Sequence, residues 1–97
     1  MGFEETVHAS GVAELVMRHP PVNALTVAGW HELGERILSL GRRADVAVVV
    51  LRAEGRGFNA GVDIKEMQRT EGFDALLGAN RGCAVAFSAV YDCEVPV

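Results

Sequence analysis

The chain of 97 residues is predicted to belong to the α/β class. Segments with the two-residue period of strands alternate with segments that have the helical period of 3.6 residues. A valine-rich run lies between two helical segments, as expected of a strand in a sheet covered by helices. Hydrophobic residues make up 49% of the chain and charged residues 23%, an ordinary balance for a globular protein. These observations predict one small α/β domain or part of a larger one.

The N-terminal segment is predicted to form a hairpin, with strands over residues 3–8 and 12–18 and a turn at Gly11. The second strand alternates well, with Val12, Glu14, Val16 and Arg18 set against Ala13, Leu15 and Met17. Glu14 is expected at the surface. Pro20 and Pro21 then end the pattern, because proline cannot donate a ladder hydrogen bond.

Residues 26–40 are predicted to form a helix that begins at an N-cap, Thr26. Its apolar side chains recur at spacings of three and four, namely Val27, Trp30, Leu33, Ile37 and Leu40. Gly41 is expected to stop the helix. The following segment, residues 45–55, is the strongest strand prediction. Its valine run suggests burial on both faces and a neighbouring strand on each side.

The stretch "GRGFNAGVDIKEM", residues 55–67, contains three glycines within seven residues. Neither the dinucleotide fingerprint nor the P-loop spacing is met. Two interpretations remain open, a plain turn and a loop whose backbone N–H groups face a ligand. The ligand loop is plausible because α/β folds place ligands at the carboxyl ends of strands, where helix N-termini leave N–H groups free.

A short helix is predicted to begin at Ile64, because Asp63 and Glu66 fit a capping box. Glu66 is therefore expected to be a capping residue rather than a catalytic base. A longer helix is predicted to follow, up to about Tyr91. Several of its side chains fall roughly on one side, namely Leu76, Leu77, Cys83, Ala84, Phe87, Val90 and Tyr91.

Three stretches together carry a resemblance to the crotonase superfamily of enoyl-CoA hydratases and isomerases. "FNAGVDIKEM" resembles its F-x-A-G-A-D-[IL]-x-x-[ML] signature, "HPPVNALT" its R-P-x-x-N-A-L segment, and "VAVVVLRAEGRGF" the strand before the signature. The resemblance implies a crotonase-like ββα spiral fold, with residues 1–97 as the N-terminal part of a single domain whose remainder lies outside this chain. The fuller stretch "EGRGFNAGVDIKEMQRTEGF" also looks like an actinobacterial branch linked to steroid ring degradation.

The resemblance implies a role for several residues. The backbone N–H of Val62 would donate to the thioester oxygen as one half of an oxyanion hole. Asp63, Ile64 and Lys65 match the positions along the adenine and phosphate end of coenzyme A, and Ala24, Ala60 and Gly61 those along the pantetheine. Asn59 stands where the family usually has a small residue. The second oxyanion donor and the catalytic acids and bases are expected downstream of these 97 residues.

The implied function is that of an acyl-CoA thioester enzyme of the hydratase/isomerase type, which stabilises a thioester enolate. A ring-opening hydrolase in steroid catabolism is one form of it. The alternative is a non-catalytic acyl-CoA-binding or assembly fragment completed by another chain. Coenzyme A would enter as part of the substrate, with no prosthetic group. The family also implies a homo-trimer or hexamer, or a second chain that completes the fold.

Charge and residue spacing argue against other functions. The net charge of −4 provides no broad basic field for nucleic acid or anionic membranes. The longest apolar run is too short to span a bilayer, and a cytoplasmic location is expected. No metal site is expected, because His8, His19 and His31 lack metal-ligand spacing.

Overall fold

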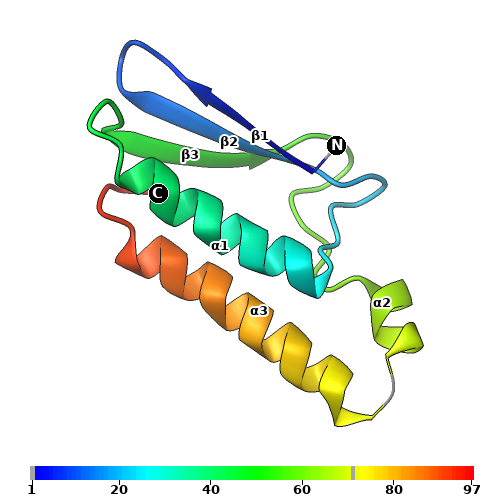
Figure 1. Cartoon of the computed structure of the whole chain (residues 1–97). Helices are drawn as coiled ribbons and strands as arrows, with labels where there is room; N and C mark the ends of the chain where they lie inside the picture. Colours follow the sequence, from blue (N-terminus) through cyan, green and yellow to red (C-terminus); the bar gives the residue numbers. More distant parts are fainter. Residues whose placement is uncertain (1, 71) are drawn as a thin grey trace.

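The computed structural model describes residues 2–70 and 72–97. It contains a three-stranded sheet in the order β1-β2-β3 and three helices. Helix α1 (Val27–Gly41) lies along one face of the sheet, and α3 (Phe73–Asp92) packs against α1 on the side away from the sheet (Figure 1). The short helix α2 (Ile64–Arg69) lies near one end of this assembly. Strands and helices therefore follow the predicted α/β order.

The sheet confirms the predicted hairpin. β1 (Gly2–Val7) pairs antiparallel with β2 (Val12–Arg18), and Gly11 has a positive φ of 93° in the turn. β3 (Val48–Ala53) pairs parallel with β2, with Ala13 opposite Val49. A parallel pair needs a crossover connection, and α1 provides it.

The prediction that β3 is buried on both faces is wrong for this chain. Val49 is 1% exposed, but its neighbour Val50 is 41% exposed, because helices cover only one face of the sheet. The expected second neighbour is partly present. Val49 N–H donates to the carbonyl of Pro96 at 2.9 Å, so residues near the C-terminal end lie along the free edge of β3.

The uncovered face of the sheet carries a group of charged side chains. Glu14 accepts hydrogen bonds from His8 and from Arg52, and these bonds lower the pKa of its carboxyl group. Further ion pairs extend this pattern across all three strands, linking Arg52 to Glu54, Glu54 to Arg18, and Arg18 to Glu4. This arrangement of alternating charges is typical of a solvated surface, and Glu14 lies there as expected.

Helix α1 begins as predicted, because the Thr26 hydroxyl accepts the Gly29 N–H at 3.0 Å. The predicted glycine stop is wrong. Gly41 lies inside the helix, and Arg42 is the C-cap with an ordinary φ of −87°. A Cβ on Gly41 would lie 2.5 Å from the Cys93 sulfur. Glycine is therefore needed at this position for close packing rather than for an unusual backbone angle.

Helix α3 faces α1 with small residues rather than with its large apolar ones. Its buried residues recur at spacings of four and three, namely Ala75, Ala79, Gly82, Ala86 and Ala89. The two helices approach closely at two glycines. A Cβ on Gly34 would lie 2.9 Å from Val85 Cγ1, and one on Gly82 would lie 2.9 Å from Trp30 Cβ. The large side chains therefore point elsewhere, and Phe87 is 65% exposed.

Candidate functional site

The candidate site lies where the loop after β3 meets the loop after β2 (Figure 1). Leu25 and Val62 form an isolated parallel bridge between the two loops. Leu25 N–H donates to the Gly61 carbonyl and Asp63 N–H donates to the Leu25 carbonyl, both at 2.9 Å. The bridge places the start of α2 beside the start of α1.

This bridge fixes the direction of the Val62 amide. In a trans peptide unit the C=O and N–H point in opposite directions within one plane. Because the Gly61 carbonyl points at Leu25, the Val62 N–H points away from it. Among the described residues this N–H has no hydrogen-bond partner. Gly61 has a φ of +100°, and a Cβ on it would meet no atom within 4 Å, so the backbone angle rather than crowding requires glycine there.

Asn23 ties the two loops together, a role that the sequence reading does not predict. It is 1% exposed and has a positive φ of 57°. Its amide nitrogen donates to the carbonyls of Glu54 at 2.8 Å and Gly57 at 2.9 Å, and its amide oxygen accepts the His19 N–H at 2.7 Å. The sequence did contain a signal for this role, because Asn23 lies inside the otherwise apolar run Val22–Leu25. An amide side chain that is buried with apolar neighbours needs hydrogen-bond partners.

Helix α2 is anchored to α1 through its capping residues. The Asp63 carboxylate accepts the Glu66 N–H at 3.0 Å, so the predicted N-cap is confirmed. The reciprocal half of the predicted capping box is wrong. The Glu66 carboxylate instead accepts the Val27 N–H at 2.8 Å. Glu66 is therefore a capping residue as expected, but it caps the first turn of α1.

A hollow of about 320 Å³ lies at this junction. It is lined by His19, Pro20, Pro21, Val22, Ala24, Asp63, Ile64 and Lys65. Four of the predicted coenzyme A positions therefore meet in one place, whereas Ala60, Gly61 and Val62 do not line it. Lys65 forms no ion pair within residues 2–70 and 72–97, and it is the only lysine of the chain. Burial lowers the pKa of His19 on the opposite wall.

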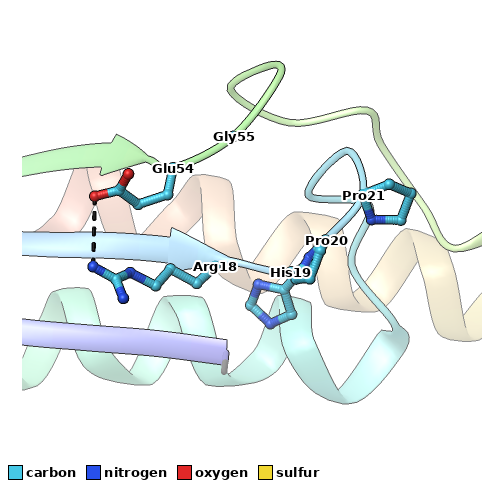
Figure 2. A pocket seen from close by; sticks show the side chains of 6 residues that line it. All are labelled: Arg18, His19, Pro20, Pro21, Glu54 and Gly55. Atoms are coloured by element: carbon cyan, nitrogen blue, oxygen red, sulfur yellow. Dashed lines mark ion pairs between the residues drawn. The ribbon is translucent and has the colours of Figure 1, made fainter.

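A second hollow of about 410 Å³ lies around the same loop and contains none of the predicted residues. Figure 2 shows Arg18 and Glu54 facing each other across the ends of β2 and β3, with His19, Pro20 and Pro21 beside them. Arg18 pairs with Glu54 at 3.5 Å and with Glu4 at 3.1 Å. Its charge is therefore already matched by carboxylates, which makes this hollow a weaker site for an anion.

A third hollow, of about 350 Å³, borders the glycine-rich loop on its N-terminal side. It is lined mainly by apolar side chains, together with Asn59: Met17, Trp30, Leu33, Leu51, Phe58, Ala86, Phe87 and Val90. Residues 58–59 thus border an apolar hollow, and residues 63–65 border the hollow with a free lysine. Val62 stands between them in the sequence.

Residues 7–97 match the sequence model of the Enoyl-CoA hydratase/isomerase family, so the chain belongs to this family. It is 59% identical over its whole length to a (7aS)-7a-methyl-1,5-dioxo-2,3,5,6,7,7a-hexahydro-1H-indene-carboxyl-CoA hydrolase of Rhodococcus jostii, of which it covers 38%. A protein of the same name from Mycobacterium tuberculosis is 54% identical over 97 residues. The chain covers 39% of the length of that protein.

Solved structures support the same fold. An enoyl-CoA hydratase of Mycobacterium smegmatis superimposes with a TM-score of 0.90 at 30% identity, over 100% of this chain and 38% of that one. The predicted crotonase-like fold is therefore confirmed for this part of it. The chain spans less than two fifths of the length of these relatives. In the described part of the chain, no helix is both long enough and apolar enough to cross a membrane.

Proposed function

We propose that the protein carrying this chain acts on an acyl-CoA thioester, and that Val62 N–H is one donor of its oxyanion hole. The observation that carries this proposal is the Gly61–Val62 peptide. Its carbonyl is held by Leu25, and its N–H is turned away without a described partner. A preorganised donor of this kind stabilises negative charge that develops on a thioester oxygen, as an enolate or a tetrahedral intermediate. The second donor and the acid–base groups would come from outside these residues.

The two hollows beside the loop suggest how the substrate lies. The adenine and phosphate end of coenzyme A would occupy the hollow beside Asp63, Ile64 and Lys65, and Ala24 in the same hollow would contact the start of the pantetheine. The pantetheine would pass Ala60 and Gly61 to place the thioester at Val62. The acyl group would then extend toward the apolar hollow next to Phe58.

The acyl group we propose is the bicyclic indene-carboxyl-CoA that the names of two close relatives specify. The reaction would be a ring-opening hydrolysis in steroid catabolism, as the sequence resemblance suggests. Hydration of an enoyl-CoA is the second candidate, because other relatives are named as probable enoyl-CoA hydratases. The enzyme is favoured over a non-catalytic fragment because relatives along the whole chain are named as enzymes. We further propose a cytoplasmic homo-trimer or hexamer, as the family resemblance suggests.

The direct test is turnover by the complete protein. The bicyclic indene-carboxyl-CoA and a short-chain enoyl-CoA should be compared as substrates, with products followed by mass spectrometry. Conversion of the bicyclic thioester at the higher kcat/KM supports the hydrolase, and faster hydration of the enoyl-CoA supports the second candidate. Binding of both thioesters without turnover of either would favour the non-catalytic alternative.

Replacing Lys65 by alanine is expected to weaken coenzyme A binding roughly fivefold at low ionic strength, because one exposed charge pair contributes up to about 1 kcal/mol. Added salt should shrink the difference, since screening acts over about 8–10 Å. The measurement is titration calorimetry with coenzyme A at two salt concentrations. Arg69→Ala is the matched control, because Arg69 lies on the same helix but does not line the hollow. Equal affinities of wild type and Lys65→Ala at low salt would contradict the role.

We also propose that residues 1–97 form the N-terminal part of a single domain, so that more polypeptide covers the outer face of α3. On that face Phe73 is 79%, Phe87 65% and Tyr91 91% exposed. The 97-residue chain on its own is therefore expected to self-associate, because large apolar patches rarely stay exposed on soluble monomers. Sedimentation velocity measures this, and Phe87→Glu should shift the chain toward the monomer. A monomeric wild-type chain with a sharp unfolding transition would argue against the proposal.

A further inference from the structure

The side chain of Asn59 makes two hydrogen bonds that converge on the backbone before Val62. Its amide oxygen accepts the Gly61 N–H at 2.9 Å, which closes a local turn over two residues. Its amide nitrogen donates to the Asn23 carbonyl at 2.7 Å. One side chain therefore joins the glycine-rich loop to the loop that precedes α1.

The anchor for Asn59 is itself firmly held. Asn23 is 1% exposed, and its side chain bonds to three backbone groups of the two loops. Its own N–H donates to the His19 carbonyl at 2.7 Å. Asn59 is thus fixed to a residue with little freedom to move.

Gly61 is the position at which such a restraint matters. Its φ of +100° and the open space around it leave the residue free to change conformation unless its peptide groups are held. Asn59 holds its N–H, and Leu25 holds its C=O at 2.9 Å. The two peptide planes that flank Gly61 are therefore restrained separately, and the second of these planes contains the Val62 N–H.

We propose that Asn59 is a positioning residue: by holding the Gly61 N–H it limits motion at Gly61, and so keeps the Val62 N–H in the direction that the Leu25 bridge defines. This inference rests on the proposed oxyanion role of Val62. Without the Asn59 amide, only the Leu25 bond restrains Gly61, and the Val62 N–H samples directions that do not reach the thioester oxygen. Binding of the coenzyme A end is unaffected in this account, because the hollow at Lys65 does not include Asn59. Asn59 also lines the apolar hollow proposed for the acyl group, so direct contact with the acyl group is the competing account that the KM measurement tests.

The test uses Asn59→Ala and Asn59→Ser in the complete protein. Asn59→Ala should lower kcat roughly fivefold to tenfold, with KM and the coenzyme A affinity within about twofold, because one orienting hydrogen bond is lost. Asn59→Ser should recover part of the loss, since a serine hydroxyl can accept the Gly61 N–H more weakly. Asn80→Ala is the matched control, because Asn80 lies on α3 and lines none of the three hollows, so its replacement should leave both parameters unchanged.

A second readout uses no substrate. The amide chemical shift and hydrogen exchange of Val62 should change in Asn59→Ala and not in Asn80→Ala. An unchanged Val62 amide overturns the positioning role, and so does a raised KM at constant kcat, which would place Asn59 in contact with the substrate. A changed Val62 amide with an unchanged kcat overturns the oxyanion role of Val62 itself, and with it the catalytic effect assigned to Asn59.

Discussion

Val62→Pro is expected to lower kcat on the acyl-CoA substrate by roughly 10²–10³-fold, the usual effect of removing one oxyanion donor. Proline lacks the backbone N–H that is proposed to stabilise the oxyanion. The bridge to Leu25 should survive, because it uses the Gly61 carbonyl and the Asp63 N–H but not the Val62 N–H. Steady-state kinetics on the complete protein measures the effect.

Val62→Ala is the control for this experiment, because it shortens the side chain and keeps the N–H. It should retain most of the activity. Circular dichroism and the coenzyme A affinity show whether Val62→Pro is still folded. A folded Val62→Pro enzyme with near wild-type kcat would exclude Val62 as an oxyanion donor.

Gly34→Ala is expected to destabilise the protein by about 1–2 kcal/mol. The new Cβ would lie 2.9 Å from Val85 Cγ1 and 3.1 Å from the Val85 carbonyl oxygen, so the backbone of α3 must move. Overpacking of this kind costs about 1–3 kcal/mol, and the better helix propensity of alanine offsets at most about 1 kcal/mol of it. Urea unfolding of the complete protein measures the change in the free energy of unfolding.

Gly78→Ala is the same type of substitution, but it is expected to raise the stability rather than lower it. A Cβ on Gly78 would lie 3.4 Å from the nearest atom of Val27, an ordinary contact. The helix propensity gain should therefore remain, and stability should rise by about 0.5–1 kcal/mol. If Gly34→Ala were as stable as Gly78→Ala, the close approach of α1 and α3 at this point would be wrong.

Local signals in the sequence were sufficient for the elements and their N-caps. Thr26 and Asp63 each bond an N–H three residues further along the chain, so their role can be read from a few neighbouring residues. The Asn23 side chain also donates to two carbonyls, and Glu66 accepts from one N–H, that lie 31 to 39 residues away, and no local pattern identifies these partners. Val62 was predicted as an oxyanion donor from the family resemblance. The bonds of its neighbours Gly61 and Asp63 to Leu25 could not have been predicted from the sequence of the loop alone.

The error about the burial of β3 has a clear physical cause. A valine run shows that β3 can be buried, but it does not show which faces receive a helix. In α3 the large apolar residues do not mark the contact with α1, because two helices approach most closely where side chains are smallest. The recurrence of alanine and glycine at spacings of four and three was the better predictor of the α1–α3 contact.

The bond between Glu66 and the first N–H of α1 has a consequence for how a ligand enters. Together with the Asp63–Leu25 bond, it ties α2 to the start of α1 at two points. The wall of the hollow that carries Lys65 is therefore already in place before a ligand arrives. Binding of a ligand the size of coenzyme A then costs little entropy for ordering that wall. We therefore expect the association rate to be limited by diffusion and by adjustment of the facing loop at Pro20–Val22. Closure of α2 should not limit it.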